Sequence, residues 1–165
     1  NASVIVKNKL HKDVLAWEVE VKDLNIDVES LDYKLQDGLF GKNVITRFEN
    51  NNKELTQKVL KVLDLEAIKI IIPEYKEIDI KIFKDVPGFK LWPHFDLRTH
   101  KGFIMINLID NKNSTVFCNM EEEYLCEASN KKNKGVFHVL HKGPIMHHIE
   151  NNSNKNRYTT IAFIK

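Results

Sequence analysis

The hydrophobic positions of the chain follow two different periods. Leu55, Val59 and Val62 recur at helical spacing, which places them on one face of a helix. Asn51 can cap this helix, and Glu54 three residues later completes a capping-box pattern. The pattern therefore predicts one helix whose apolar face packs on the rest of the molecule.

Most other segments alternate between apolar and polar residues, as a strand with one buried face does. The isoleucine-rich run Ile68–Ile72 lacks this alternation and predicts a strand buried on both faces. Short strands at such close spacing are typical of a sandwich or a barrel. We therefore expect a mainly β fold with a flanking helix. The predicted strands are 15–21, 68–72, 78–82, 89–96, 103–109, 115–118, 136–141, 145–149 and 157–164.

Length and charge narrow the class of protein. The 165 residues suit a single domain, residues 1–165, with its core at about 68–165. Lys and Arg number 25 against 23 Asp and Glu, and this near-neutral balance argues against a nucleic-acid partner. No apolar run approaches the roughly 20 residues that span a bilayer. The two cysteines, Cys118 and Cys126, do not make a disulfide framework. We expect a cytoplasmic protein with no membrane partner.

The clearest candidate chemistry is the triplet His94-Phe95-Asp96 in a predicted strand. Residues i and i+2 of a strand point the same way, so the imidazole and the carboxylate lie side by side. Pro93 just before them suits a strand start or an edge strand, where its missing N–H does no harm. With one distant histidine, the pair would make the facial triad that holds iron(II) and leaves coordination positions open.

Two neighbours compete to be the third ligand, His147 and His148. Successive strand residues point to opposite faces, so only one of them faces inward. We expect the polar segment 151–156 to close a hairpin in which His147 shares a face with Arg157 and Thr159. That face is rich in Ile and Phe, as a barrel interior is. We therefore interpret His147 as the inward histidine.

A buried arginine on this inward face would need an anion. Burying an unpaired guanidinium is costly, and a carboxylate can meet Arg157 with two parallel hydrogen bonds. Thr159, two residues further on, can add a hydroxyl to the same oxygens. Metal triad, buried cation and hydroxyl together describe a site for a metal-chelating dicarboxylate.

These motifs resemble the iron(II)- and 2-oxoglutarate-dependent dioxygenases, particularly the prolyl-hydroxylase-like branch. In that family His-x-Asp precedes a second His by roughly fifty residues, and an Arg or Lys lies about ten residues further on. Here His147 precedes Arg157 by ten residues, whereas His148 would give nine. Met105–Leu108 and Gly135–Leu140 resemble further strands of the family. The resemblance covers roughly residues 78–165.

The resemblance implies a double-stranded β-helix, or jelly roll. His94, Asp96 and His147 would bind Fe(II), and Arg157 with Thr159 would bind the distal carboxylate of 2-oxoglutarate. The co-substrate is decarboxylated to succinate while dioxygen supplies the hydroxyl group that enters a C–H bond of the substrate. The chemistry belongs to the metal and co-substrate, and the protein orients and shields them.

Some alternatives stay open at this point. The family often has Gly-Gly-x-Thr before a Phe where this chain has Asn-Ser-Thr-Val-Phe at 113–117, and its co-substrate Tyr has no equivalent near 82–89. The substrate can be a peptide side chain or a small molecule, and Arg98, His100 and Asn107 are candidate contacts for it. The alternatives to a dioxygenase are a non-catalytic metal-binding jelly roll and a cupin-type metal-dependent enzyme.

Overall fold

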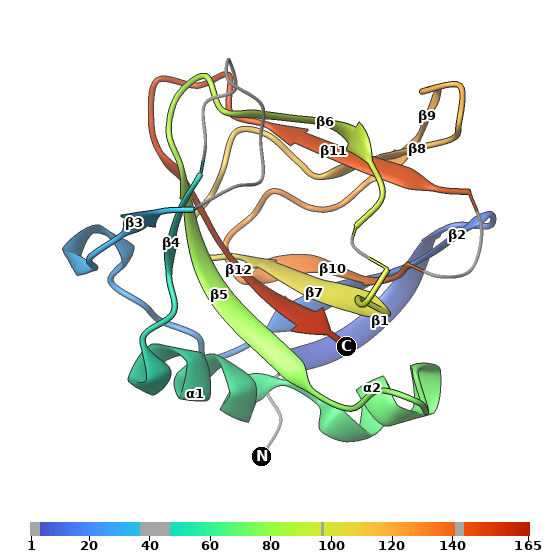
Figure 1. Cartoon of the computed structure of the whole chain (residues 1–165), viewed down its shortest axis with the longest axis horizontal. Coiled ribbons are helices and arrows are strands. Elements are labelled where there is room, and N and C mark those ends of the chain that lie inside the picture. The colour runs from blue at the N-terminus through green and yellow to red at the C-terminus, as the bar shows by residue number, and fades with distance from the viewer. Residues whose placement is uncertain (1–3, 37–46, 97, 141–143) are drawn as a thin grey trace.

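Two antiparallel sheets face each other, and helices cover the outer side of the larger one (Figure 1). The computed structural model describes residues 4–36, 47–96, 98–140 and 144–165. The larger sheet has eight strands and the smaller sheet has four. The mainly β fold with flanking helix that the sequence predicts is confirmed.

The larger sheet takes strands from both halves of the chain. Its strands in spatial order are β1 (Val4–His11), β2 (Val14–Val21), β10 (Lys134–Val139), β7 (Gly102–Asn107), β12 (Arg157–Ile164), β5 (Ile78–Asp85), β4 (Phe48–Asn50) and β3 (Lys34–Leu35). The smaller sheet has the order β6 (Lys90–His94), β11 (Met146–Glu150), β8 (Val116–Cys118) and β9 (Tyr124–Glu127). The helices are the short 3₁₀ helix η1 (Val28–Ser30), α1 (Lys53–Val62) and α2 (Leu65–Ile71).

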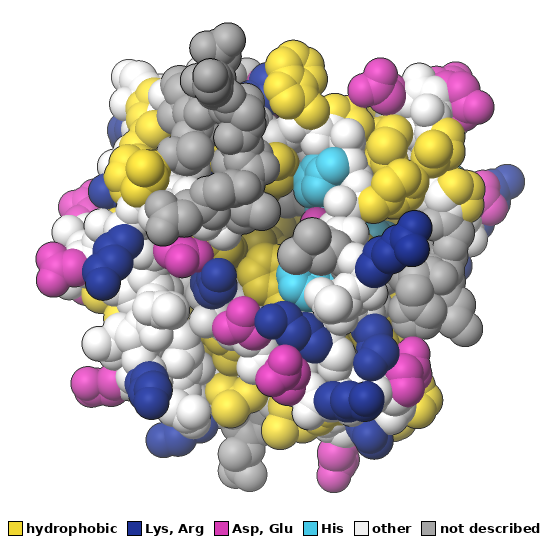
Figure 2. Space-filling view, viewed as in Figure 1, with side chains coloured by type: hydrophobic (Ala, Val, Ile, Leu, Met, Phe, Trp, Pro, Cys, Tyr) yellow, Lys and Arg dark blue, Asp and Glu magenta, His cyan; other side chains and the backbone are white. Residues whose placement is uncertain are grey.

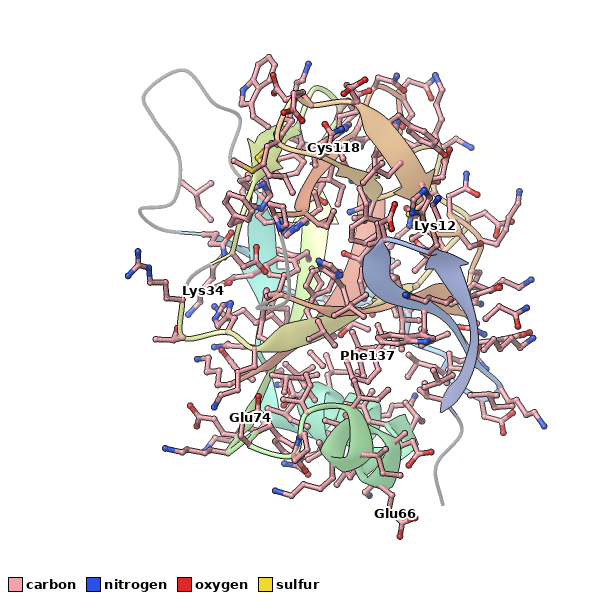
Figure 3. All side chains as sticks on the ribbon, turned by 90° about the vertical axis from the view of Figure 1, so that its right-hand side faces the viewer. Lys12, Lys34, Glu66, Glu74, Cys118 and Phe137 are labelled. Atoms are coloured by element: carbon pink, nitrogen blue, oxygen red, sulfur yellow. The ribbon has the colours of Figure 1, made fainter. Side chains whose placement is uncertain are left out.

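The large sheet separates two apolar layers, as the alternation along β7 shows. Ile104 and Ile106 join the layer between this sheet and the helices. Phe103 and Met105 point the other way, into the layer between the two sheets. Figure 3 shows the helical layer from the side, with Phe137 pointing into it. The candidate site lies in the other layer, between the sheets.

Helix α1 lies where the sequence predicts a helix, but its N-cap is one residue later than predicted. The side chain of Asn52, one residue after the predicted cap Asn51, accepts hydrogen bonds from the backbone N–H groups of Glu54 and Leu55. These are donors that the first turn of a helix leaves without a partner. The apolar face predicted from Val59 and Val62 is buried.

The predicted strand at Ile68–Ile72 is wrong, because this segment belongs to α2 and its C-cap. Asp64 caps the helix by accepting a hydrogen bond from the N–H of Ala67. Burial follows one helical face, with Ile68 1% exposed and Ile70 79% exposed. A run of isoleucines fits a buried strand and a helix equally well, so the local pattern alone could not decide between them.

The remaining predicted strands are confirmed, and the sequence missed β1, β9 and the short strands β3 and β4. His141, the last residue of one predicted strand, lies outside the described residues. β1 was missed because it is an edge strand whose outward side chains are largely polar. Since β1 and β2 belong to the large sheet, the buried core extends well before residue 68.

Neither cysteine is oxidised in the fold. Cys118 and Cys126 are both free and buried, on the neighbouring strands β8 and β9. Cys118 lies on the smaller sheet, far from the helices in Figure 3. Within the described ranges, no helix is long and apolar enough to cross a membrane.

Candidate metal centre and its pocket

Strand pairing in the smaller sheet brings the three predicted ligands together. β6 is an edge strand, as Pro93 suggested, and its residue His94 pairs directly with His147 of β11. Asp96 lies two residues beyond His94, just past the end of β6. One ligand atom from each of the three side chains lies within 4.8 Å of the others.

The two imidazoles converge on one carboxylate oxygen. Nε2 of His94 lies 3.3 Å from Oδ1 of Asp96, and Nε2 of His147 lies 3.2 Å from the same oxygen. Nδ1 of His94 donates a hydrogen bond to the carbonyl of Trp92 at 2.6 Å. A carbonyl can only accept, so this bond holds a proton on Nδ1 and leaves Nε2 as the ring nitrogen that would bind a metal.

The carboxyl group of Asp96 is ionised over the whole physiological range. Burial by itself raises its pKa, but hydrogen bonds from His147 and His94 outweigh burial and hold the pKa well below its usual value. Two imidazoles and one carboxylate form the donor set of non-haem iron(II) sites. The described residues therefore fit a divalent metal.

The cluster lies in the wall of a cavity of about 550 Å³ between the two sheets. Figure 2 shows this hollow, with hydrophobic side chains in its depth and histidine beside it. Phe103, Met105 and Ile161 contribute to the apolar lining. Trp92 and Phe95 also line it and are 60% and 49% exposed, so they lie at its mouth. The volume falls within the range usual for small-molecule sites.

His147 is the histidine of the cluster, as predicted, although the predicted reason is wrong. β11 and β12 form no hairpin with each other, because β11 belongs to the smaller sheet and β12 to the larger. Asn151 organises the connection by donating to the carbonyls of Asp85 and Lys155. The apolar faces of the two sheets oppose each other, so His147 and Arg157 still point into the same layer.

A buried charge cluster accompanies Arg157. Asp85 of β5 pairs in register with Arg157 of β12, and its Oδ2 accepts from Nη1 of Arg157 at 2.9 Å. On the other side of β5, Phe48 of β4 pairs with Lys84, which brings the preceding residue Arg47 beside Asp85. Nε and Nη2 of Arg47 donate to the two carboxylate oxygens at 2.9 and 2.8 Å. Asp85 is fully buried and binds both arginines.

Arg157 itself is only 2% exposed. Burial lowers the pKa of its guanidinium, Asp85 raises it and Arg47 lowers it, and the net result is a pKa lowered to about 10. The group therefore stays protonated at neutral pH. Its Nε and Nη2 are buried and have no hydrogen-bond partner among the described residues, and the same holds for Oγ1 of Thr159. These donors match the oxygens of an anion. Among the described residues Arg157 does not line the cavity, whereas Arg47 does.

The three residues predicted as candidate substrate contacts differ in where they lie. His100 lines the cavity, and burial lowers the pKa of its ring. Arg98 is exposed and is not one of the described lining residues. The side-chain amide of Asn107 donates to the carbonyls of Ser129 and Lys134, so it holds a loop.

Sequence reasoning missed Arg47 and Asp85. Arg47 lies in the first 50 residues, for which no motif was found, and Asp85 ends a strand whose partners the sequence did not reveal. The one available signal was the predicted inward Arg157, since a buried charge needs a partner.

Comparison with family models and with curated protein sequences finds no match for the chain. Comparison with solved structures does. A 2OG-Fe(II) oxygenase family oxidoreductase from Burkholderia pseudomallei matches with a TM-score of 0.62 and 10% identity, covering 83% of this chain and 74% of that one. A Pseudomonas putida prolyl-4-hydroxylase matches with a TM-score of 0.62 and 11% identity, covering 84% and 80%.

The chain has the double-stranded β-helix fold of these oxygenases. The non-heme alpha-ketoglutarate-dependent epimerase SnoN from nogalamycin biosynthesis has the same fold, with a TM-score of 0.55, 9% identity and coverage of 93% and 78%. At such identities the likeness concerns the fold, so the function is argued from the site.

Proposed function

We propose that the protein is an iron(II)- and 2-oxoglutarate-dependent dioxygenase that hydroxylates a C–H bond of its substrate, with residues 1–165 acting as one domain. The observation that carries the proposal is the convergence of His94, Asp96 and His147 in the wall of an apolar cavity. The fold, shared with 2OG-Fe(II) oxygenases, supports it.

His94, Asp96 and His147 would hold the iron. Arg157 and Thr159 would hold the distal carboxylate of 2-oxoglutarate, which is supported by their buried donors that have no partner in the described part of the chain. When bound, iron and co-substrate supply the oxidising power through decarboxylation to succinate and reduction of dioxygen. The protein fixes the tautomer of His94, keeps Asp96 ionised and excludes water with the apolar lining.

The substrate would enter past Trp92 and Phe95, whose exposed rings flank the cavity mouth. A peptide side chain or a small molecule fits this description. The similar structures include a prolyl-4-hydroxylase and an epimerase from nogalamycin biosynthesis. The two free cysteines support a reducing compartment, and we include a cytoplasmic location in the proposal.

A second candidate function is a non-catalytic metal-binding module. One observation favours it: Arg157 already has a carboxylate partner in Asp85 and is not among the described residues that line the cavity. Such a module would bind a divalent metal at the triad without binding 2-oxoglutarate. A cupin-type enzyme is disfavoured because the described cluster contains two histidines and an aspartate.

The test is anaerobic addition of Fe(II) and then 2-oxoglutarate to metal-free protein, followed by visible absorption. We expect a weak charge-transfer band that appears only with both, because the 2-oxo acid chelates protein-bound iron. His147→Ala should remove the band and iron binding, while the neighbouring His148→Ala should keep both. Iron binding without any band would support the binding module, and failure to bind iron would contradict both functions.

A further inference from the structure

Two buried arginines share a single carboxylate at one end of the cavity. Arg47 is 5% exposed, Arg157 is 2% exposed, and Asp85 between them is fully buried. Asp85 accepts three hydrogen bonds, two from Arg47 and one from Arg157. Two positive charges and one negative charge leave this cluster of described residues with one excess positive charge. Buried charge of this kind is strongly destabilising unless an anion meets it.

Arg47 is the member of the pair that reaches the cavity. Its guanidinium stacks on the ring of Phe83 at 3.9 Å and lies 5.1 Å from the ring of Phe89, which fixes the plane of the group. Nε and Nη2 are taken by Asp85. Nη1 makes no hydrogen bond to any described residue, and Arg47 lines the same cavity as the metal cluster.

One polar group near Arg47 lacks a partner, and so does a second one in the lining of the same cavity. The backbone N–H of Gln36 donates to the carbonyl of Arg47, and the side-chain Oε1 of Gln36 is buried without a partner in the described ranges. Oγ1 of Thr115 is buried and similarly without a described partner. Both residues line the cavity. The part of the pocket lined by Arg47 and Gln36 is therefore polar and carries a positive charge.

We propose that Arg47 is a second binding residue for the distal carboxylate of the co-substrate and that it makes the pocket select a dicarboxylate over a monocarboxylate 2-oxo acid. Asp85 is a positioning residue that holds both guanidiniums. This inference rests on the proposed function, because the ligand is 2-oxoglutarate. Arg47 lies outside the segment in which the sequence resembles the dioxygenases.

The test measures ligand binding to Zn(II)-loaded protein by calorimetry, because zinc supports chelation without turnover. Two ligands are compared: 2-oxoglutarate and 2-oxobutyrate, which lacks the distal carboxylate. We expect wild-type protein to prefer 2-oxoglutarate. Arg47→Met should weaken 2-oxoglutarate binding about tenfold to a hundredfold, the usual range for a lost charge-assisted hydrogen bond. Binding of 2-oxobutyrate should stay unchanged.

Arg98→Met is the matched control, since Arg98 is exposed and outside the described lining, and it should leave both affinities unchanged. If Arg47→Met keeps the full preference for 2-oxoglutarate while the wild type binds it, the role of Arg47 is wrong and the proposed function stands. If metal-loaded wild type binds neither 2-oxo acid, the proposed function fails, and the inference fails with it.

A measurement on unaltered protein covers the case in which Arg47→Met does not fold. The chain has only three arginines, Arg47, Arg98 and Arg157. Their Nε–H groups should therefore give three side-chain signals in a ¹⁵N NMR spectrum. Arg98→Met assigns one, and through-space contacts with the ring of Phe83, on which the guanidinium of Arg47 stacks, assign that of Arg47. We expect 2-oxoglutarate, and not 2-oxobutyrate, to shift the Arg47 signal of the zinc-loaded protein. A shift confined to Arg157 would overturn the inference.

Discussion

The two histidines of the metal cluster differ in how their second ring nitrogen is satisfied. Nδ1 of His94 donates to a backbone carbonyl, but Nδ1 of His147 is buried without a partner in the described part of the chain. Nε2 of His138 is also buried and unpartnered there, and its ring centroid lies 6.0 Å from that of His147. Nδ1 of His138 donates to the carbonyl of Leu15 at 3.0 Å, which leaves Nε2 as an acceptor.

When a metal takes Nε2 of His147, its Nδ1 carries the proton, and this donor and the acceptor on His138 can be joined through one water. We predict that His138→Phe lowers the affinity for Zn(II) about tenfold to a hundredfold, as loss of an outer hydrogen-bond partner of a metal ligand usually does. His138→Gln keeps an acceptor and should retain most of the affinity. Calorimetric titration measures both. Equal affinities in all three proteins would contradict the prediction, and thermal melting of the metal-free forms controls for folding.

At the scale of single residues, the sequence predicted features that follow from alternation along one strand. It missed features that depend on which strands become neighbours. The i, i+2 spacing of His94 and Asp96 was available from the strand pattern, and so was the placement of His147 and His148 on opposite faces. The choice of His147 as the inward histidine rested on a hairpin that does not form. The link between Asp85 and two arginines was not, because it joins β4, β5 and β12 across the sheet. No local pattern specifies which strands become neighbours.

Among the elements, α1 gives the sharpest test of local sequence rules. The capping-box pattern pointed to Asn51, whereas the structure uses Asn52. We predict that Asn52→Ala lowers the free energy of unfolding by about 1 kcal/mol, the typical value of an N-cap. Asn51→Ala, the neighbouring control, should cost much less. Urea denaturation measures both, and equal losses would show that the cap is not at Asn52.

Element type was predictable where apolar and polar residues alternate clearly, and it failed where the pattern is ambiguous or weak. β5 was recognised because Ile78, Ile80 and Ile82 alternate with polar residues. The segment 68–72 was misassigned because the deciding signals, the cap at Asp64 and the exposure of Ile70, lie outside the run or depend on tertiary packing. Edge strands such as β1 carry little apolar signal on their outer face.

At the scale of the whole molecule, the buried thiols make stability depend on alkaline pH. Burial raises the pKa of Cys126 to about 11, above its ordinary value of 9. Between these values the folded state holds a proton that the unfolded state has lost. The stabilising contribution is therefore present below about pH 9 and disappears as pH rises towards 11.

We predict that the free energy of unfolding of wild-type protein falls more steeply between pH 9 and pH 11 than that of Cys126→Ala. Urea denaturation at several pH values, under reducing conditions, gives the two curves. Other groups titrate in the same range, so the difference between the proteins is the informative quantity. Parallel curves would show that Cys126 is not protected by the fold.

The metal cluster and the positively charged end of the cavity belong to different sheets. His94 and His147 lie on the smaller sheet, with Asp96 directly after it, whereas Asp85 and Arg157 lie on the larger one. A molecule that chelates the metal and also reaches the arginines would tie one sheet to the other, while the metal alone would brace only the smaller. Amide hydrogen exchange should therefore slow in two stages: metal protects β6 and β11, and the dicarboxylate extends protection to β5 and β12. The co-substrate would then stabilise the packing of the two sheets against each other, in addition to its part in the reaction.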